Sequence, residues 1–207
     1  MTASRERILD AAWSLLESGQ PSMVRMSDIA KAAGISRQAV YLHFPSRADL
    51  LIATTRHIDQ AKNIDARLAA SRQAATGLAR LNAFIAAWGD YIPEIYGVAK
   101  ALMAMKDSDE AAALAWADRM TALRDGCGAA IQALKKQGAL NPIYPLKQAV
   151  DILATLLSVE NWAHLTIDHG WPQRRYVSTM QDIARRVLVK ADAETQEVAP
   201  KSGAFFG

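Results

Sequence analysis

The sequence predicts an all-α protein in which a three-helix N-terminal domain precedes a longer helical bundle. Apolar residues recur at helical spacing in successive segments, beginning with Ile8, Ala12, Leu15 and Leu16. Glycines and prolines separate these segments, so that two short helices near the N-terminus are followed by several long ones. A hydrophobic content of 51% over 207 residues is ample for a core.

The expected helices follow in chain order from these patterns and their end signals. Ser27 and Ser36 are the expected N-caps of the two short helices, and Gly34 between them supplies a left-handed stop. Ser46 and Asp49 form a capping box ahead of the next helix. The helices are expected over residues 4–18, 27–33, 37–43, 47–68, 78–91, 92–105, from the polar break 107–109 to 136, 146–169 and 173–190.

Proline and glycine inside the later segments predict local irregularities. Pro93 should start or kink a helix. Gly126 and Gly128 interrupt the segment that ends at 136, where a glycine costs about 1 kcal/mol relative to alanine, so a close helix contact or a bend is expected there. Residues 192–207 lack periodicity and are predicted to be a disordered tail.

The two short helices have the pattern of a helix-turn-helix. Ala30 precedes Gly34 by four residues, and its small side chain allows the helices to approach closely. Apolar side chains that would hold the helices at a steep angle are Ile29, Ala33, Ile35 and Val40. The second helix of such a unit can enter the major groove of DNA. The alternatives are an αα-hairpin that only packs and a helix-turn-helix that is used for protein contact.

The second helix carries the residue types that read DNA. Arg37 and Gln38 lie at its N-terminal end, where side chains reach base edges, and they can pair with guanine and adenine. Tyr41, His43 and Arg47 suit phosphate oxygens, which position a protein on the duplex. The expected DNA-binding residues are therefore Ser27, Ser36, Arg37, Gln38, Tyr41, His43 and Arg47.

The run IAKAAGISRQAVYLHFPSRADLL resembles the DNA-binding signature of TetR-type transcriptional repressors. The ending Tyr41-x-His43-Phe44, followed by Pro45-Ser46-Arg47, carries most of this resemblance. The resemblance implies a DNA-binding domain over 1–46 and a ligand-binding and dimerisation domain over 47–191. It also implies a homodimer formed by the last two long helices, which binds palindromic operator DNA and is usually a repressor released by a small molecule.

Aromatic residues and methionines between 84 and 165 are candidates for the core and also for an effector pocket. Ligand pockets are mostly apolar, contain few polar groups and often lie between helices. The expected ligand-binding residues are Trp88, Trp116, Met120, Asn161, Trp162 and His164, for an apolar or aromatic effector. The spacing of Glu160 and His164 is also compatible with a metal ligand pair, but a polar strip or a ligand hydrogen bond is favoured.

Composition limits the other function classes. The single Cys127 excludes an internal disulfide, no stretch reaches the roughly 18 apolar residues of a membrane span, and the N-terminus does not resemble a signal peptide. These features favour a cytoplasmic protein, and neither a cofactor nor a metal is expected. No catalytic motif is present, so no enzymatic activity is expected either. The alternative is a helical-bundle enzyme or small-molecule carrier without sequence-specific DNA binding. The effector, the operator and the sign of regulation stay open.

Overall fold

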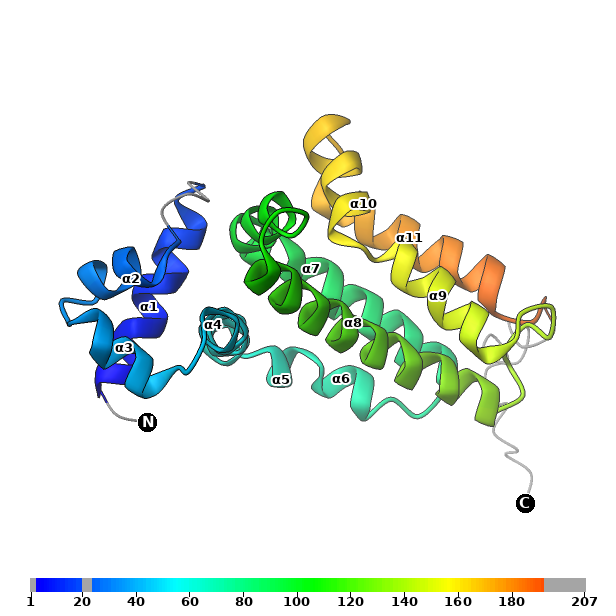
Figure 1. Ribbon diagram of the computed structural model, residues 1–207. Coiled ribbons are helices and arrows are strands. Elements are labelled where there is room, and N and C mark those ends of the chain that lie inside the picture. The colour runs from blue at the N-terminus through cyan, green and yellow to red at the C-terminus, as the bar shows by residue number, and fades with distance from the viewer. Residues whose placement is uncertain (1–2, 20–23, 192–207) are drawn as a thin grey trace, which may run out of the picture. The chain divides into compact units, whose positions relative to one another are not determined.

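The computed structural model describes residues 3–19 and 24–191, and within these ranges it contains helices and no β-strand (Figure 1). The all-α expectation is thus confirmed, with an N-terminal helix-turn-helix followed by a helical domain. The predicted tail at 192–207 and the segment 20–23 after the first helix lie outside the described residues. None of the described helices is both long and apolar enough to cross a membrane.

The chain divides into two compact units. Of the described residues, the first holds 3–19, 24–67 and 91–123, and the second holds 68–90 and 124–191. Two long helices contribute to both units, α7 (Gly77–Met105) and α8 (Glu110–Lys136).

The first unit begins with three helices, α1 (Ala3–Glu17), α2 (Met26–Ala32) and α3 (Arg37–His43). Their shared core is fully apolar and includes Ile8, Leu16, Ile29, Val40 and Phe44. The α2–α3 turn forms as the sequence predicts, since Gly34 has a φ of +67° and the hydroxyl of Ser36 accepts a hydrogen bond from the Ala39 amide at 3.1 Å.

The expected N-cap of α2 was wrong by two residues. Arg25 is the N-cap, with extended backbone angles, and its side chain makes no capping hydrogen bond. Met26 is the first helical residue and is buried, so the helix starts early enough to carry this side chain into the core. Ser27 therefore lies in the first turn, where it is exposed.

Helix α4 (Arg47–Ala61) starts with the predicted capping box between Ser46 and Asp49. The expected helix over 47–68 is too long. The chain leaves the helix after Ala61, because Asn63 adopts a positive φ of 54°, and a short helix α5 (Ile64–Arg67) follows. Helix α4 packs against α1, which connects it to the helix-turn-helix.

Charged side chains also attach α4 to α7 and α8 within the first unit. Arg119 forms ion pairs with Asp59 and with Asp118, and the Tyr91 hydroxyl donates to Asp59 at 2.7 Å. Arg56 pairs with the other oxygen of Asp118 at 2.6 Å. Burial lowers the pKa of Arg119, but the two carboxylates outweigh it and raise that pKa above its usual value.

The second unit contains α6 (Ala69–Arg72), α9 (Leu146–Leu156), α10 (Val159–Ala163), the π-helical turn η2 (His164–Asp168) and α11 (Gln173–Leu188). Helices α9 and α11 run alongside each other (Figure 1). The expected continuous helix over 146–169 is wrong. It breaks at Leu157 and Ser158, where the Ser158 hydroxyl accepts from the Asn161 amide and caps α10.

Helix α7 continues through Pro93, although the sequence suggested a new or kinked segment there. A proline cannot donate to the carbonyl four residues earlier, which here belongs to Gly89. The Gln173 side-chain amide donates to this carbonyl at 2.8 Å instead. Gly89 also lies against Val177, and a side chain on it would meet that residue at 2.9 Å. A partner from α11 thus satisfies the carbonyl that the proline leaves open.

Candidate nucleic-acid interface

The second helix of the helix-turn-helix presents a polar face. Ser36, Arg37, Gln38 and Tyr41 are exposed, whereas Val40 is fully buried on a helix that packs against α2. The Arg37 guanidinium donates to the Tyr41 hydroxyl at 3.3 Å and lies 5.6 Å from the centre of that ring. Side chains one helical turn apart therefore support each other on the exposed surface.

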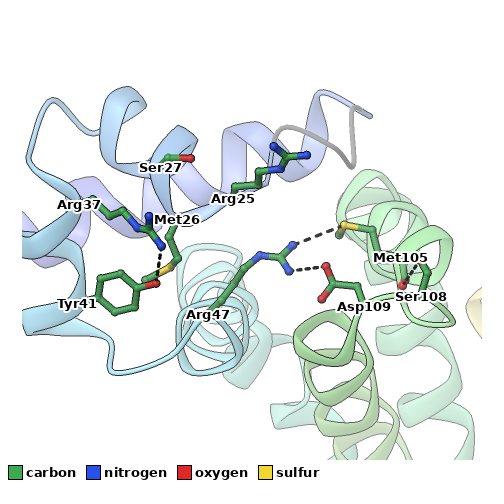
Figure 2. A pocket seen from close by; sticks show the side chains of 9 residues that line it. All are labelled: Arg25, Met26, Ser27, Arg37, Tyr41, Arg47, Met105, Ser108 and Asp109. Atoms are coloured by element: carbon green, nitrogen blue, oxygen red, sulfur yellow. Dashed lines mark hydrogen bonds and ion pairs between the residues drawn. The ribbon is translucent and has the colours of Figure 1, made fainter.

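An open pocket of about 660 Å³ adjoins this face (Figure 2). Three arginines line it, namely Arg25, Arg37 and Arg47, together with Ser27 and Tyr41. Four of the predicted DNA-binding residues thus meet around one cationic opening. The sequence patterns did not identify Arg25 as a DNA-binding residue. The only local feature that could have indicated it is its position beside the start of α2.

Arg47 is more enclosed than a phosphate contact requires. Its Nε donates to the Val24 carbonyl at 2.7 Å, its guanidinium forms an ion pair with Asp109, and its side chain is 22% exposed. Figure 2 shows the guanidinium directed at Asp109 and Met105, where the turn between α7 and α8 lies. The assignment of Arg47 to phosphate remains a prediction, and any phosphate would have to compete with Asp109.

The Asp109 carboxylate has two functions in this arrangement. Its Oδ1 accepts from the Ala112 amide at 3.1 Å and caps α8, while its Oδ2 pairs with Arg47. Partial burial alone would raise the pKa of Asp109, but the hydrogen bonds from Arg47 and from the helix amide hold that pKa below its usual range. Asp109 is therefore an anion at neutral pH and a persistent partner for Arg47.

The remaining predicted DNA-binding residues lie on the same helix-turn-helix. Gln38 is exposed beside Arg37, and His43 at the end of α3 is half-buried. Phe44, which follows it, is buried, and the Arg5 guanidinium lies 4.9 Å from its ring centre. The signature residues thus include a buried apolar group and an exposed polar group, and Leu42 is an apolar exception that is 81% exposed.

The predicted effector residues fall in different units. Trp116 and Met120 belong to the first unit, whereas Trp88, Asn161, Trp162 and His164 belong to the second. The Trp88 indole donates to the Leu157 carbonyl at 2.8 Å, and the Trp162 indole donates to Gln173 at 2.9 Å. Both indoles connect elements of the second unit, so they have structural roles whether or not a ligand contacts them. Their assignment to a ligand stays a prediction.

Residues 8–54 match the family described as bacterial regulatory proteins, tetR family. The transcriptional repressor LfrR of Mycolicibacterium smegmatis is 42% identical over 60 residues, which are 29% of this chain and 31% of that protein. The match therefore spans less than a third of that relative and is confined to one part of it.

Solved structures extend the similarity in fold to most of the chain. A Rhodococcus sp. protein assigned to the TetR family superposes with a TM-score of 0.72 at 20% identity, over 91% of this chain and 100% of that one. The regulator FadR of Bacillus subtilis, solved with stearoyl-CoA, superposes with a TM-score of 0.69 at 14% identity, over 86% and 96%.

Proposed function

Because the chain belongs to the TetR family of bacterial regulatory proteins through its N-terminal domain, we propose that it is a ligand-responsive transcriptional repressor. It binds palindromic operator DNA as a homodimer and is released by a small, largely apolar effector. The observation that carries this proposal is the polar, exposed face of α3, a helix that Ser36 caps and that Val40 anchors in the core. Functionally, residues 1–46 bind DNA and residues 47–191 bind ligand and partner, although the compact unit around α1–α3 also includes 91–123.

The roles on DNA follow from position along α3. Arg37 and Gln38, in its first turn, read base edges in the major groove. Ser27, Ser36, Tyr41 and His43 contact phosphates and set the register of the helix. Arg47 joins them by exchanging Asp109 for a phosphate oxygen. In the homodimer, two α3 helices enter successive major grooves about 34–36 Å apart.

Helices α9 and α11 are the proposed dimer surface. Each keeps apolar side chains that are only partly buried within the single chain, namely Val150, Ile152 and Leu156 on α9, and Ile183 and Val187 on α11. Their fully buried neighbours, such as Leu153 and Tyr176, already pack inside the second unit. Burying the remaining apolar surface against a second copy would give a four-helix bundle.

The effector class rests on composition and on one relative. The helical domain is rich in aromatic and methionine side chains, and the structurally similar FadR was solved with stearoyl-CoA, a molecule with a long apolar chain. The candidate contacts remain Trp88, Trp116, Met120, Asn161, Trp162 and His164. The effector releases the protein from DNA only to the extent that it binds the DNA-free conformation more tightly than the DNA-bound one.

A selection of binding sites from random duplex DNA at physiological salt tests the proposal. Enrichment of a palindrome with half-sites one helical turn apart is expected, and an Arg37→Ala, Gln38→Ala double variant should not enrich it. A folded dimer that enriches no sequence would contradict the proposal. The alternative of a helical-bundle enzyme or small-molecule carrier would then be tested by ligand binding and turnover.

A further inference from the structure

Two histidines of the second unit converge at the end of η2. The Nε2 atoms of His164 and His169 lie 3.3 Å apart, and the rings meet edge to face with centroids 4.6 Å apart. A tetrahedral zinc ion with Zn–N bonds of 2.0–2.1 Å separates two ligand nitrogens by about 3.3 Å. We propose that His164 and His169 form a binding site for a divalent transition metal ion of the zinc class.

The π-helical turn is what brings the two rings together. In an α-helix with 3.6 residues per turn, residues five apart point in directions about 140° from each other. In η2 the His169 amide instead bonds to the His164 carbonyl at 3.1 Å, so the two residues stand about one turn apart. Such turns are rare in proteins, and those that do occur often lie at functional sites.

Asp168 orients one of the two ligands. Its Oδ2 lies 3.1 Å from Nδ1 of His164, which places the proton on Nδ1 and leaves the Nε2 lone pair facing His169. In metal-binding histidines the N–H of the second ring nitrogen usually donates a hydrogen bond to a carboxylate, a backbone carbonyl or water. An imidazole-to-imidazole hydrogen bond is the competing explanation for the short contact, and it predicts no affinity for metal.

The site offers two protein nitrogens and leaves other coordination positions open. Among the residues that the structure describes, no group of three or more His, Cys, Asp or Glu side chains is arranged around one metal position. His164 and Asp168 are exposed, at 63% and 62%, so water or a second copy of the chain has access to the remaining positions. Imidazole ligands suit zinc, copper and nickel rather than magnesium or calcium.

Titration of tag-free, metal-stripped full-length protein with Zn²⁺ alone tests the inference by calorimetry, without DNA and independently of the proposed function. One ion per chain, or one per two chains if a second copy completes the site, is expected. His164→Gln and His169→Gln should each weaken binding by about tenfold or more, and Asp168→Asn by about 10–100-fold. These side chains are exposed, so circular dichroism should report an unchanged fold.

His57 provides the matched control, because it also pairs with a carboxylate, Asp10 at 2.8 Å, but has no second imidazole as a hydrogen-bond partner. His57→Gln should bind Zn²⁺ like the unaltered chain, and Zn²⁺ should shift the ring proton signals of His164 and His169 but not those of His57. Equal Zn²⁺ binding by the unaltered chain and the His164→Gln variant would overturn the inference. Unshifted ring signals at His164 and His169 would do the same.

Discussion

Two glycines of α8 lie two residues apart and should respond in opposite directions to the same substitution. A Cβ atom built on Gly126 would lie 2.5 Å from a ring carbon of Phe84, whereas a Cβ atom on Gly128 would meet nothing within 4 Å. Both glycines sit inside the helix, so alanine is conformationally favourable at each. We expect Gly128→Ala to stabilise the protein and Gly126→Ala to destabilise it.

The magnitudes follow from two opposing effects. Replacing glycine by alanine in a helix interior stabilises by about 0.5–1 kcal/mol, and Gly128→Ala should gain this in full. At Gly126 the same gain is opposed by overpacking, because carbon atoms prefer separations of about 3.5–4.0 Å and Phe84 is only 5% exposed. Overpacking typically costs about 1–3 kcal/mol, so Gly126→Ala should lose up to about 2 kcal/mol on balance.

Urea unfolding of the full-length variants, followed by far-UV circular dichroism, measures this difference. The two alanine variants should differ by about 1–3 kcal/mol, which corresponds to roughly 2–12 °C in Tm for a chain of this size. Phe84→Leu should relieve the clash, so a double-mutant cycle with Gly126→Ala should give a coupling energy of about 1–2 kcal/mol. Equal stability of the two alanine variants, or zero coupling, would refute the contact between Gly126 and Phe84.

Three further predictions concern charged residues. Arg37→Ala should lose about 1–3 kcal/mol at particular base positions in a competition binding assay, and an equal loss on every sequence would show that Arg37 contacts only phosphate. Asp109→Asn keeps the cap of α8 but removes the charge that holds Arg47, so fluorescence anisotropy should report several-fold tighter operator binding. An unchanged affinity would mean that Arg47 keeps its internal partner when the protein is bound to DNA. Burial alone would raise the pKa of Asp118, but its two arginine partners lower that pKa below its usual value. The Asp118 carboxylate therefore stabilises the fold above about pH 4, and this stabilisation is lost as the pH falls through the folded-state pKa. Asp118→Asn should therefore flatten the decline in stability measured by acid titration, and an unchanged decline would argue against the ion pairs.

The N-terminal domain could be predicted almost completely from its own residues. Gly34, the Ser36 cap and the capping box between Ser46 and Asp49 act through hydrogen bonds that span three to five residues, so the sequence pattern contains both partners. The exposed positions of Arg37, Gln38 and Tyr41 also follow from helical periodicity around the buried Val40. For these residues the local pattern and the final structure agree.

Two of the mispredicted or missed features depend on partners distant in the chain. Pro93 stays inside a helix because Gln173, eighty residues later, satisfies the carbonyl of Gly89. Arg47 is held by Asp109, at a sequence separation of 62, and no spacing rule connects the two residues. Local patterns identify which groups need a hydrogen-bond or charge partner, whereas chain folding determines which distant residue provides it. The early end of α4 and the break before α10 differ from these, because they carry local signals, the positive φ of Asn63 and the Ser158 cap, which helical periodicity alone did not reveal.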